Sequence, residues 1–346
     1  MSEKAIYRII DANYNRAREG LRVMEEFCRF GLNDPGLSGR AKQLRHALCT
    51  QVDRLPGDAL LCARDTCGDV GVGQSVQGQW QRRDLYDCLT AAAKRLVEAL
   101  RALSECIQTF DPGLAQEIEQ IRYQAYTLEK DIVTQGIPAA RFAQVQLYVI
   151  ITQTDRQRLL DLTEQCIVGG ADCIQLRAKG LEDRALLELA SAFVECCRLG
   201  QVISIINDRV DIAVASGADG VHLGLTDLSV ATARQLQLTP LVIGSTTHNL
   251  TELEVACQER PTYVALGPAF ATDTKPDLQP AGLDYVRQAL PRLHQAGLGH
   301  CVIGGITPQS LLQVLETGAH TVAVCAAVTE ADNPEDVCVS LKQAMK

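Results

Sequence analysis

The chain has 346 residues, of which 47% are hydrophobic and 22% are charged, and its net charge is −9. This composition indicates a globular protein long enough for two domains, and it excludes a nonspecific binder of nucleic acids or anionic membranes, which needs a basic face. No segment resembles a membrane span or a secretory signal, because residues 1–16 are polar and charged. We therefore expect a cytoplasmic protein. Its fourteen cysteines show no metal-ligand spacing and are expected to be reduced thiols.

The first part of the chain, residues 1–135, has helical periodicity and little strand signal. Turn-forming stretches rich in Asn, Asp, Pro and Gly separate the periodic segments. We predict an all-α domain over 1–135, with residues 135–138 as the linker to the second domain. Its helices are expected at 9–30, 37–52, 84–110 and 114–134.

Two features of this helical domain leave alternatives open. The motif R-x-x-E-x-L-R occurs at 16–22 and again at 95–101. It is explained either by solvated helix faces with local ion pairs or by two equivalent helices whose charged rows meet in a seam. The glycine-rich segment 64–73 is explained either as a flexible connector or as a turn that binds an anion or a metal. It does not fit the spacing of a phosphate-binding loop, because no G-K-[ST] follows.

From residue 145 onward, short apolar runs alternate with helical segments. Eight such pairs predict a (β/α)8 TIM barrel over about residues 136–346, so the fold class is α/β, with the all-α domain in front. The runs are almost continuously apolar, as expected for parallel strands that are covered on both faces. The strands are expected at 146–151, 173–176, 202–206, 220–223, 241–243, 263–266, 301–303 and 321–325.

The second strand of the barrel ends in polar residues. Alternation along the strand places Gln175, Arg177 and Lys179 on one face. Functional groups of this fold lie where the strands end, and a barrel interior has little room for unpaired cations. We therefore expect these side chains to bind an anionic ligand that also carries heteroatoms.

Two carboxylates follow the third and fourth strands. Asp208 comes directly after Asn207, and Asp227 lies just beyond His222 and the end of its strand. Two aspartates at one rim are the oxygen ligands that Mg²⁺ prefers. Each aspartate is also a good N-cap for the helix that follows it, so helix capping is a competing explanation for both.

The remaining strands end in hydroxyls, glycines and one further lysine. Thr246 follows the fifth strand, the segment 272–275 follows the sixth, Gly304–Gly305 follows the seventh and Cys325–Ala326 ends the eighth. Glycines and bare backbone N–H groups after the last two strands are typical of a phosphate site in this fold. We expect two anion sites, one for a monophosphate and one for a metal-bound diphosphate. Such a pair indicates substitution at carbon with pyrophosphate leaving.

Over about residues 140–346 the sequence resembles the thiamine-phosphate synthases. The resemblance is carried by five motifs in order: I-Q-L-R-A-K-G, I-I-N-D-R-V-D-I-A, A-D-G-V-H-L-G, L-G-P-A-F-A-T-D-T-K and I-G-G-I. It implies a transferase of thiamine biosynthesis that condenses hydroxymethylpyrimidine diphosphate with a thiazole phosphate, releasing pyrophosphate. It also implies that the diphosphate departs first, leaving a pyrimidine-methyl cation that the thiazole nitrogen captures.

The resemblance further implies a role for each site residue. Asp208 and Asp227 would bind the Mg²⁺ cofactor. Catalytic roles would fall to Asn207, Arg177, Lys179 and Lys275. The substrate-binding residues would be Gln175, Leu176, Arg177, Ala178, Lys179, Asn207, Thr246 and Lys275 for the pyrimidine diphosphate, and Thr272, Asp273, Thr274, Gly305, Cys325 and Ala326 for the thiazole phosphate.

Alternatives remain for both domains. A thiazole tautomerase of the same barrel family, or a barrel that binds thiamine precursors without catalysis, would not need the acidic pair. The helical part resembles an extension in some members of the family, for which a hydroxymethylpyrimidine phosphate kinase activity is implied, and a dimerisation or channelling module is the competing interpretation. The expected partners are the two small-molecule substrates, with neither nucleic acid nor membrane, and the sequence leaves a homo-oligomer open.

Overall fold

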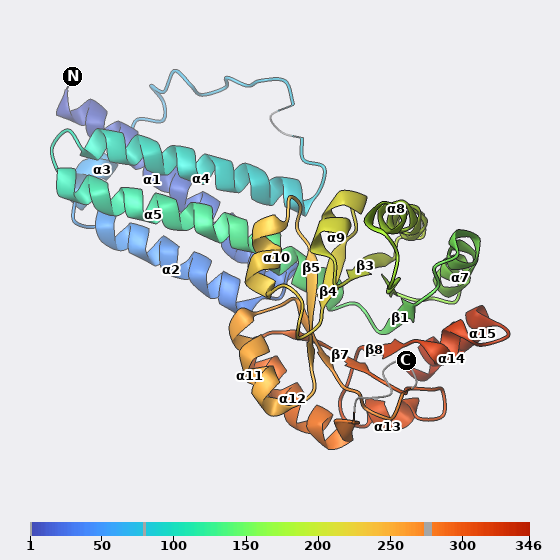
Figure 1. Cartoon of the computed structure of the whole chain (residues 1–346). Coiled ribbons are helices and arrows are strands. Elements are labelled where there is room, and N and C mark those ends of the chain that lie inside the picture. The colour runs from blue at the N-terminus through green and yellow to red at the C-terminus, as the bar shows by residue number, and fades with distance from the viewer. Residues whose placement is uncertain (1, 79–80, 273–278) are drawn as a thin grey trace. The chain divides into compact units, whose positions relative to one another are not determined.

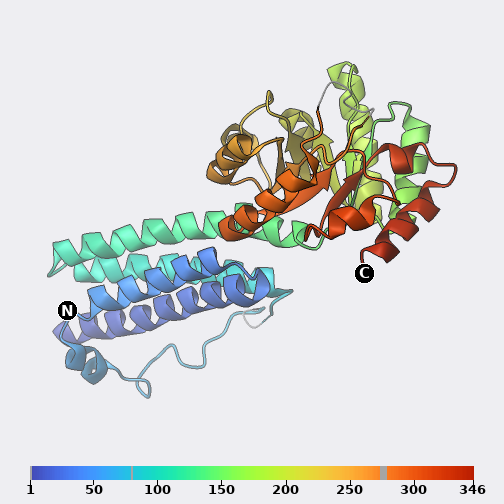
Figure 2. The same ribbon diagram turned by 90° about the horizontal axis from the view of Figure 1, so that it is seen from below.

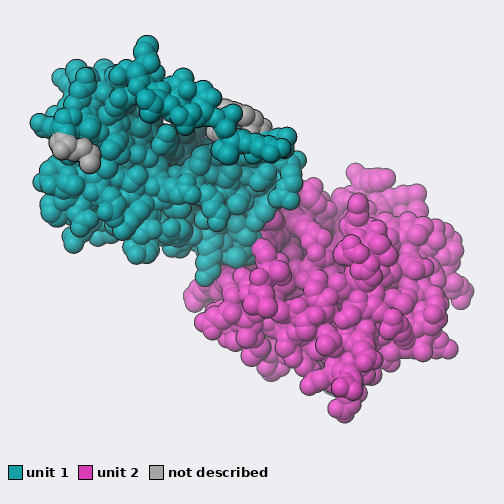
Figure 3. Space-filling view, turned by 90° about the horizontal axis from the view of Figure 1, so that it is seen from above, with its two compact units in different colours: residues 1–136 teal, residues 137–346 magenta. Residues whose placement is uncertain are grey.

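The computed structural model describes residues 2–78, 81–272 and 279–346. It divides into two compact units, Met1–Gly136 and Ile137–Lys346, which Figure 3 distinguishes by colour. The division falls one residue from the boundary expected from the sequence. Each unit has its own hydrophobic core, and each is described separately below.

The first unit is a helical bundle whose long helices lie side by side in both ribbon views (Figures 1 and 2). Asp34, Asp84 and Asp111 cap three of these helices, each accepting a hydrogen bond from a backbone N–H three residues later. The helices are α1 (Glu3–Glu26), α2 (Pro35–Val52), α3 (Gly57–Ala63), α4 (Leu85–Ile107) and α5 (Pro112–Asp131), with π-helical turns η1 (Phe27–Gly31) and η2 (Ile132–Gly136) after α1 and α5.

Helices α1 and α4, which carry the repeated motif, pack against each other at Gly20. A Cβ at this position would lie 3.0 Å from both the Ala92 carbonyl oxygen and the Leu96 Cβ, so a larger residue would push the helices apart. Arg22 pairs with Glu26 of its own helix at 2.8 Å, and Arg101 pairs with Glu105 at 2.5 Å. Both arginines are about half exposed, which favours local ion pairs over a charged seam.

The segment 64–73 connects α3 to the stretch before α4 and is exposed. The Asp65 and Asp69 carboxylates accept hydrogen bonds from the backbone N–H groups of Gly68 and Gly71. Both carboxylates therefore stabilise turns of the connector itself. No group of three or more potential metal ligands occurs among the residues that the structure describes.

The boundary between the two units, after Gly136, falls within the linker expected at residues 135–138, and the chain is helical throughout this junction. The π-helical turn η2 ends at Gly136, and helix α6 (Ile137–Phe142) begins at the next residue. Pro138, which has no backbone N–H to donate, directly follows this π-helical turn as the second residue of α6. Helix α6 brings the Phe142 ring against Tyr263 inside the barrel, with the ring centroids 4.0 Å apart.

The second unit is a closed barrel of eight parallel strands, which confirms the predicted fold (Figure 1). Each strand pairs with its neighbours in chain order, and the first strand pairs with the last. The strands are β1 (Leu147–Ile151), β2 (Cys173–Leu176), β3 (Ile203–Asn207), β4 (Gly220–Leu223), β5 (Val242–Thr247), β6 (Tyr263–Leu266), β7 (Gly299–Ile303) and β8 (Val322–Val324).

Helices follow every strand and cover the outside of the barrel, as Figure 1 shows. Their apolar faces pack on the outward side chains of the strands in one continuous core. The helices are α7 (Arg156–Val168), α8 (Asp183–Leu199), α9 (Val210–Ser216), α10 (Val230–Leu236), α11 (Leu250–Glu259), α12 (Gly282–Ala296), α13 (Leu311–Leu315), α14 (Ala326–Thr329) and α15 (Pro334–Ala344).

The interior of the barrel is a second, smaller core made by the inward residues of the strands and closed by Phe142. Alternation within one strand separates the two cores, since Tyr148 lies in the interior while Val149 lies in the outer core. None of the fourteen cysteines forms a disulfide in the described chain. No helix among the described residues is both long and apolar enough to cross a membrane.

Candidate active site

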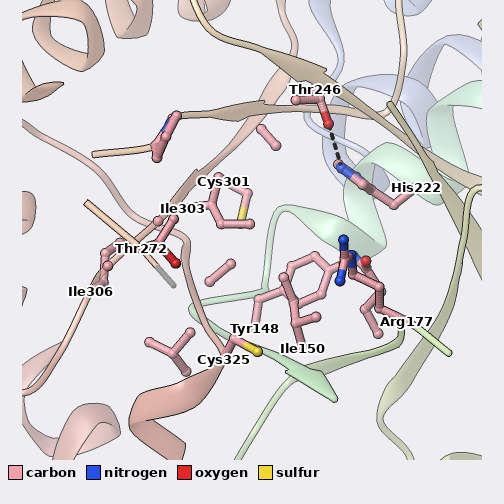
Figure 4. A pocket seen from close by; sticks show the side chains of 18 of the residues that line it. Tyr148, Ile150, Arg177, His222, Thr246, Thr272, Cys301, Ile303, Ile306 and Cys325 are labelled. Atoms are coloured by element: carbon pink, nitrogen blue, oxygen red, sulfur yellow. Dashed lines mark hydrogen bonds between the residues drawn. The ribbon is translucent and has the colours of Figure 1, made fainter. Parts of the chain in front are cut away.

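A cavity of about 310 Å³ opens inside the barrel where the strands end. Residues from all eight strands or the loops after them line it, as expected for a site in this fold. Ten of the site residues expected from the sequence lie on its wall: Gln175, Arg177, Lys179, Asn207, Asp208, Thr246, Thr272, Gly305, Cys325 and Ala326. Figure 4 shows part of this wall, with Arg177 and Tyr148 on one side and Thr272 across the cavity.

The two expected metal ligands lie close together. Burial raises the pKa of the Asp227 carboxyl above its usual value, and the neighbouring Asp208 carboxylate raises it further. The Gly224 backbone N–H, which donates to Asp227 Oδ2 at 2.7 Å, lowers it. Two like charges at one rim repel each other, so the pair is favourable only when a cation compensates it. The structure thus brings together the carboxylates that follow β3 and β4.

Neither aspartate caps a helix, which removes the competing explanation. Arg209 is the N-cap of α9, without a side-chain bond, and Ser229 caps α10 by accepting from Thr232. Asp208 has a left-handed backbone with φ of 64°, and its N–H donates to the His222 carbonyl oxygen at 2.8 Å. Holding a residue other than glycine in this conformation costs about 1–2 kcal/mol, and such strain is commonly found at functional sites.

Basic side chains from the end of β2 lie beside this acidic pair. The Lys179 ammonium is 3.2 Å from Asp208 Oδ2 and remains more than half exposed. Arg177 also lines the cavity, and no acidic side chain in the described part of the chain forms an ion pair with it. The rim therefore presents two cations and two carboxylates, which suits a ligand that carries both a metal ion and phosphate oxygens.

The opposite side of the cavity is built from glycine backbone. Gly304 and Gly305 follow β7 with φ of 102° and 63°, a region that favours glycine. A Cβ on Gly305 would lie 2.8 Å from the Phe270 Cβ and closer still to the Ala271 carbonyl oxygen. The glycines thus let the loop after β6 pack onto the loop after β7, leaving backbone at the surface of the cavity. Cys325 and Ala326, at the start of α14, also line the cavity.

A chain of hydrogen bonds crosses the floor of the cavity. Gln175 Nε2 donates to the Tyr148 hydroxyl at 2.8 Å, and the Tyr148 and Tyr263 hydroxyls are 2.9 Å apart. His222 bonds Tyr263 through Nδ1 at 3.0 Å and the Thr246 hydroxyl through Nε2 at 2.9 Å, the latter drawn in Figure 4. Burial raises the pKa of both tyrosines well above the usual value, so both hydroxyls are protonated.

Six expected site residues are not placed on the wall of the cavity. The side chains of Leu176 and Ala178 pack in or against the outer core, because alternation turns them away from the interior, so the structure does not support a side-chain contact with substrate. Asp227 lies beside Asp208 but is not among the residues that line the cavity. The other three, Asp273, Thr274 and Lys275, lie outside the described residues.

The sequence interpretation missed the aromatic floor of the site. It assigned no role to Tyr148 or Tyr263 and mentioned His222 only as a neighbour of the metal ligands. The alternation used for Gln175 and Arg177 would have found them, because Tyr148 and Tyr263 occupy inward positions of β1 and β6. A buried tyrosine usually needs a hydrogen-bond partner, and that was the available signal.

Comparison with known proteins agrees with this geometry. A family model described as thiamine monophosphate synthase matches residues 147–328, and one described as the ThiD2 family matches residues 8–131. A thiamine-phosphate synthase of Synechocystis sp. strain PCC 6803 is 39% identical over 340 residues, covering 98% of this chain and 96% of that protein. The chain belongs to the thiamine-phosphate synthase family.

Other relatives support the assignment of a thiamine-phosphate synthase. The synthase of Thermosynechococcus vestitus is 39% identical, covering 95% of this chain and 92% of that protein. Among solved structures, a thiamine phosphate pyrophosphorylase from Pyrococcus furiosus is 28% identical with a TM-score of 0.53, covering 58% of this chain and 95% of that chain. The predicted class, a transferase of thiamine biosynthesis, is confirmed. These relatives give no support to a tautomerase or a non-catalytic barrel.

Proposed function

We propose that the barrel condenses 4-amino-2-methyl-5-(diphosphooxymethyl)pyrimidine with a thiazole ethyl phosphate or its carboxylate, forming thiamine phosphate and pyrophosphate, with carbon dioxide released as well when the carboxylate reacts. The observation that supports this most is the cavity in which two cations and a glycine-built surface meet, with the acidic pair of Asp208 and Asp227 at its rim. A diphosphate substrate and a monophosphate substrate can each find complementary groups there. The two substrates would then lie close enough to react.

Asp208 and Asp227 would hold Mg²⁺. The donor set fits this ion, because Mg²⁺ is usually bound through one or two carboxylates together with waters and substrate phosphates. Burial and, to a smaller extent, Asp208 raise the pKa of Asp227, and a bound cation would relieve the repulsion between the two carboxylates. When bound, the ion would neutralise charge on the diphosphate and make it a better leaving group.

The bonds that break and form show where cationic side chains would be needed. The carbon–oxygen bond between the pyrimidine methylene and the diphosphate breaks, and the diphosphate keeps the electron pair. The thiazole nitrogen then donates its lone pair to the methylene carbon, forming the new carbon–nitrogen bond. Arg177 and Lys179 at the rim, together with Lys275 by resemblance, would stabilise the departing negative charge, while Asn207 and Gln175 hold the ring.

The thiazole phosphate would bind on the opposite side of the cavity. Gly305 and the backbone at Cys325 and Ala326 present a surface without obstructing side chains. Thr272 lines this side as well, and Asp273 and Thr274 follow it in the chain. The phosphate would thereby be anchored away from the metal end, with the thiazole ring directed toward the pyrimidine.

The function can be tested with the purified full chain, both substrates and Mg²⁺. We expect thiamine phosphate and pyrophosphate to appear in equal amounts, and we expect removal of Mg²⁺ with a chelator to stop the reaction. Substrate binding without any product would contradict the proposal and favour a precursor-binding barrel. Conversion of the thiazole compound in the absence of the pyrimidine would favour a tautomerase.

We propose that the helical unit, taken as residues 1–135, is a separate domain. Its match to the ThiD2 family supports a distinct origin from the barrel. A pyrimidine phosphate kinase-like activity and a dimerisation or channelling role both remain open for it. The cysteines, none of which forms a disulfide in the described residues, support a reducing, cytoplasmic location.

A truncation tests whether the barrel works alone. We expect residues 137–346 to fold and retain the condensation activity, because the barrel has its own cores and includes α6. A fragment that begins at residue 144 should be unstable, because it lacks Phe142, which is 1% exposed and stacked on Tyr263. Thermal melting and turnover of the two fragments check this. Equal stability would contradict the structural role of α6, and an inactive but folded 137–346 fragment would contradict an independent barrel.

A further inference from the structure

The hydrogen-bonded chain under the cavity joins two residues that the proposed function places on the pyrimidine substrate. Gln175 is at one end and Thr246 is at the other. The three side chains between them are Tyr148, Tyr263 and His222, which are 1%, 0% and 8% exposed. They come from β1, β6 and β4, so the chain crosses the barrel instead of following one strand.

Packing holds the middle of the chain in place. The Tyr263 ring is stacked between Phe142, at 4.0 Å between centroids, and His222, at 5.7 Å. The residue in register with both His222 and Tyr263 on the intervening strand β5 is Gly244. A Cβ there would lie 2.6 Å from His222 Nδ1 and closer still to the Tyr263 ring. A glycine at this position is therefore what lets the His222 and Tyr263 side chains meet.

If all the hydrogen bonds of the chain run in one direction, Tyr148, Tyr263 and His222 each accept one hydrogen bond and donate one. Gln175 Nε2 donates to Tyr148, and continuing this direction makes Tyr148 the donor to Tyr263 and Tyr263 the donor to His222 Nδ1. A neutral imidazole then carries its hydrogen on Nε2 and donates it to Thr246. In this arrangement the Gln175 carbonyl oxygen and the Thr246 hydroxyl hydrogen are not used by the chain. Turning the Gln175 amide over would require every bond to reverse.

We propose that Tyr148, Tyr263 and His222 are positioning residues that fix the orientation of the Gln175 amide and the Thr246 hydroxyl together, and thereby select an amino-substituted pyrimidine. The proposal rests on the proposed function, because that function places both end residues on the pyrimidine. An amide whose NH₂ group is held by Tyr148 offers its oxygen to a ligand N–H, such as an exocyclic amine. A pyrimidine with a carbonyl in place of the amine offers an acceptor instead, and two facing acceptors are unfavourable.

The test compares the 4-amino substrate with its 4-oxo analogue on the full chain. We expect the wild-type protein to prefer the amino compound, and we expect Tyr148→Phe to reduce that preference in kcat/KM about tenfold, because the freed amide can turn over. Tyr263→Phe should raise KM for the amino substrate about tenfold and leave KM for the thiazole phosphate unchanged. Phenylalanine keeps both rings, so packing against Phe142 is retained.

Coupling gives a second readout that a purely structural role would not produce. If the chain acts as one unit, the double variant Tyr148→Phe/Tyr263→Phe should lose no more selectivity than the worse single variant. Tyr285→Phe is the matched control. It removes a buried tyrosine hydroxyl that donates to Thr247 at 2.7 Å on the outer side of β5, and selectivity should be unchanged.

The outcomes separate this proposal from the proposed function. Folded tyrosine variants with wild-type selectivity, or additive losses in the double variant, would overturn the positioning role while the synthase activity stands. If the tyrosine variants do not fold, His222→Gln supplies the same test, since glutamine can still reach Thr246 but loses the bond to Tyr263. If the wild-type protein makes no product, the positioning role can still be tested by measuring the affinities for the amino and oxo compounds by calorimetry with Mg²⁺. Equal affinity for the two compounds would then overturn the positioning role.

Discussion

Replacing Asp208 by asparagine is expected to reduce kcat by at least about 10³-fold, equivalent to about 4 kcal/mol of transition-state stabilisation. The reason is that the variant keeps the shape of the side chain but removes one of the two carboxylates that would hold the metal on the leaving diphosphate. Asparagine also tolerates the left-handed backbone at φ of 64° better than alanine does. Asp208→Ala should be equally inactive and slightly less stable. Turnover at several Mg²⁺ concentrations and thermal melting measure both effects.

Asp211→Asn is the matched control for this experiment. Asp211 lies three residues further along, is exposed, and pairs with Arg209 at the start of α9, outside the cavity. We expect its kcat to remain within about twofold of wild type, because an exposed ion pair contributes about 1 kcal/mol or less. A folded Asp208→Asn protein with nearly normal kcat at saturating Mg²⁺ would show that the metal assignment is wrong.

Gly244→Ala is expected to destabilise the barrel by about 3 kcal/mol and to lower its melting temperature by roughly 5–10 °C. The added methyl would occupy the space in which the Tyr263 hydroxyl meets the His222 ring. Either the ring moves or the strand moves, and in both cases a buried hydroxyl loses its partner. Because Thr246 is on the same strand, kcat/KM for the pyrimidine substrate should fall as well. Calorimetry and steady-state kinetics check the two effects.

Gly39→Ala is the matched control, because the structure has space for a Cβ at this glycine. Gly39 lies inside α2, and an added Cβ would meet no other atom within 4 Å. Alanine is the better helix former, so we expect no loss and a gain of about 0.5–1 kcal/mol in the helical unit. If Gly244→Ala melted at the wild-type temperature and kept wild-type kinetics, the close packing of Tyr263 against His222 would be refuted.

Much of the architecture could be read from local patterns. Continuous apolar runs separated by helical segments predicted eight parallel strands in a closed barrel, and three of the strands, at 173–176, 220–223 and 263–266, have the expected bounds. The helical junction at Gly136 was missed, because glycine followed by proline two residues later is typical of a break. Short-range propensity favours a loop there, whereas the contact of Phe142 with the barrel interior favours a helix.

The roles of Asp208 and Asp227 could not be decided from the local sequence. Capping and metal binding predict the same residue type at the same place, so the residues alone left both explanations open. The structure decides against capping because Asp208 is in the left-handed region and Ser229 already caps α10. It also brings Asp227 next to Asp208, although the two are separated by the whole of α9 and β4.

By itself, the sequence determined the strand and helix pattern, the closed barrel and the residues that end each strand, because these depend on periodicity and on alternation along one segment. Tertiary structure alone decided which inward residues meet. The bonds from Gln175 to Thr246 pass through side chains of five strands, and they form only where Gly244 leaves space between its neighbours. That arrangement depends on register and packing between distant segments, which no pattern within a single strand contains.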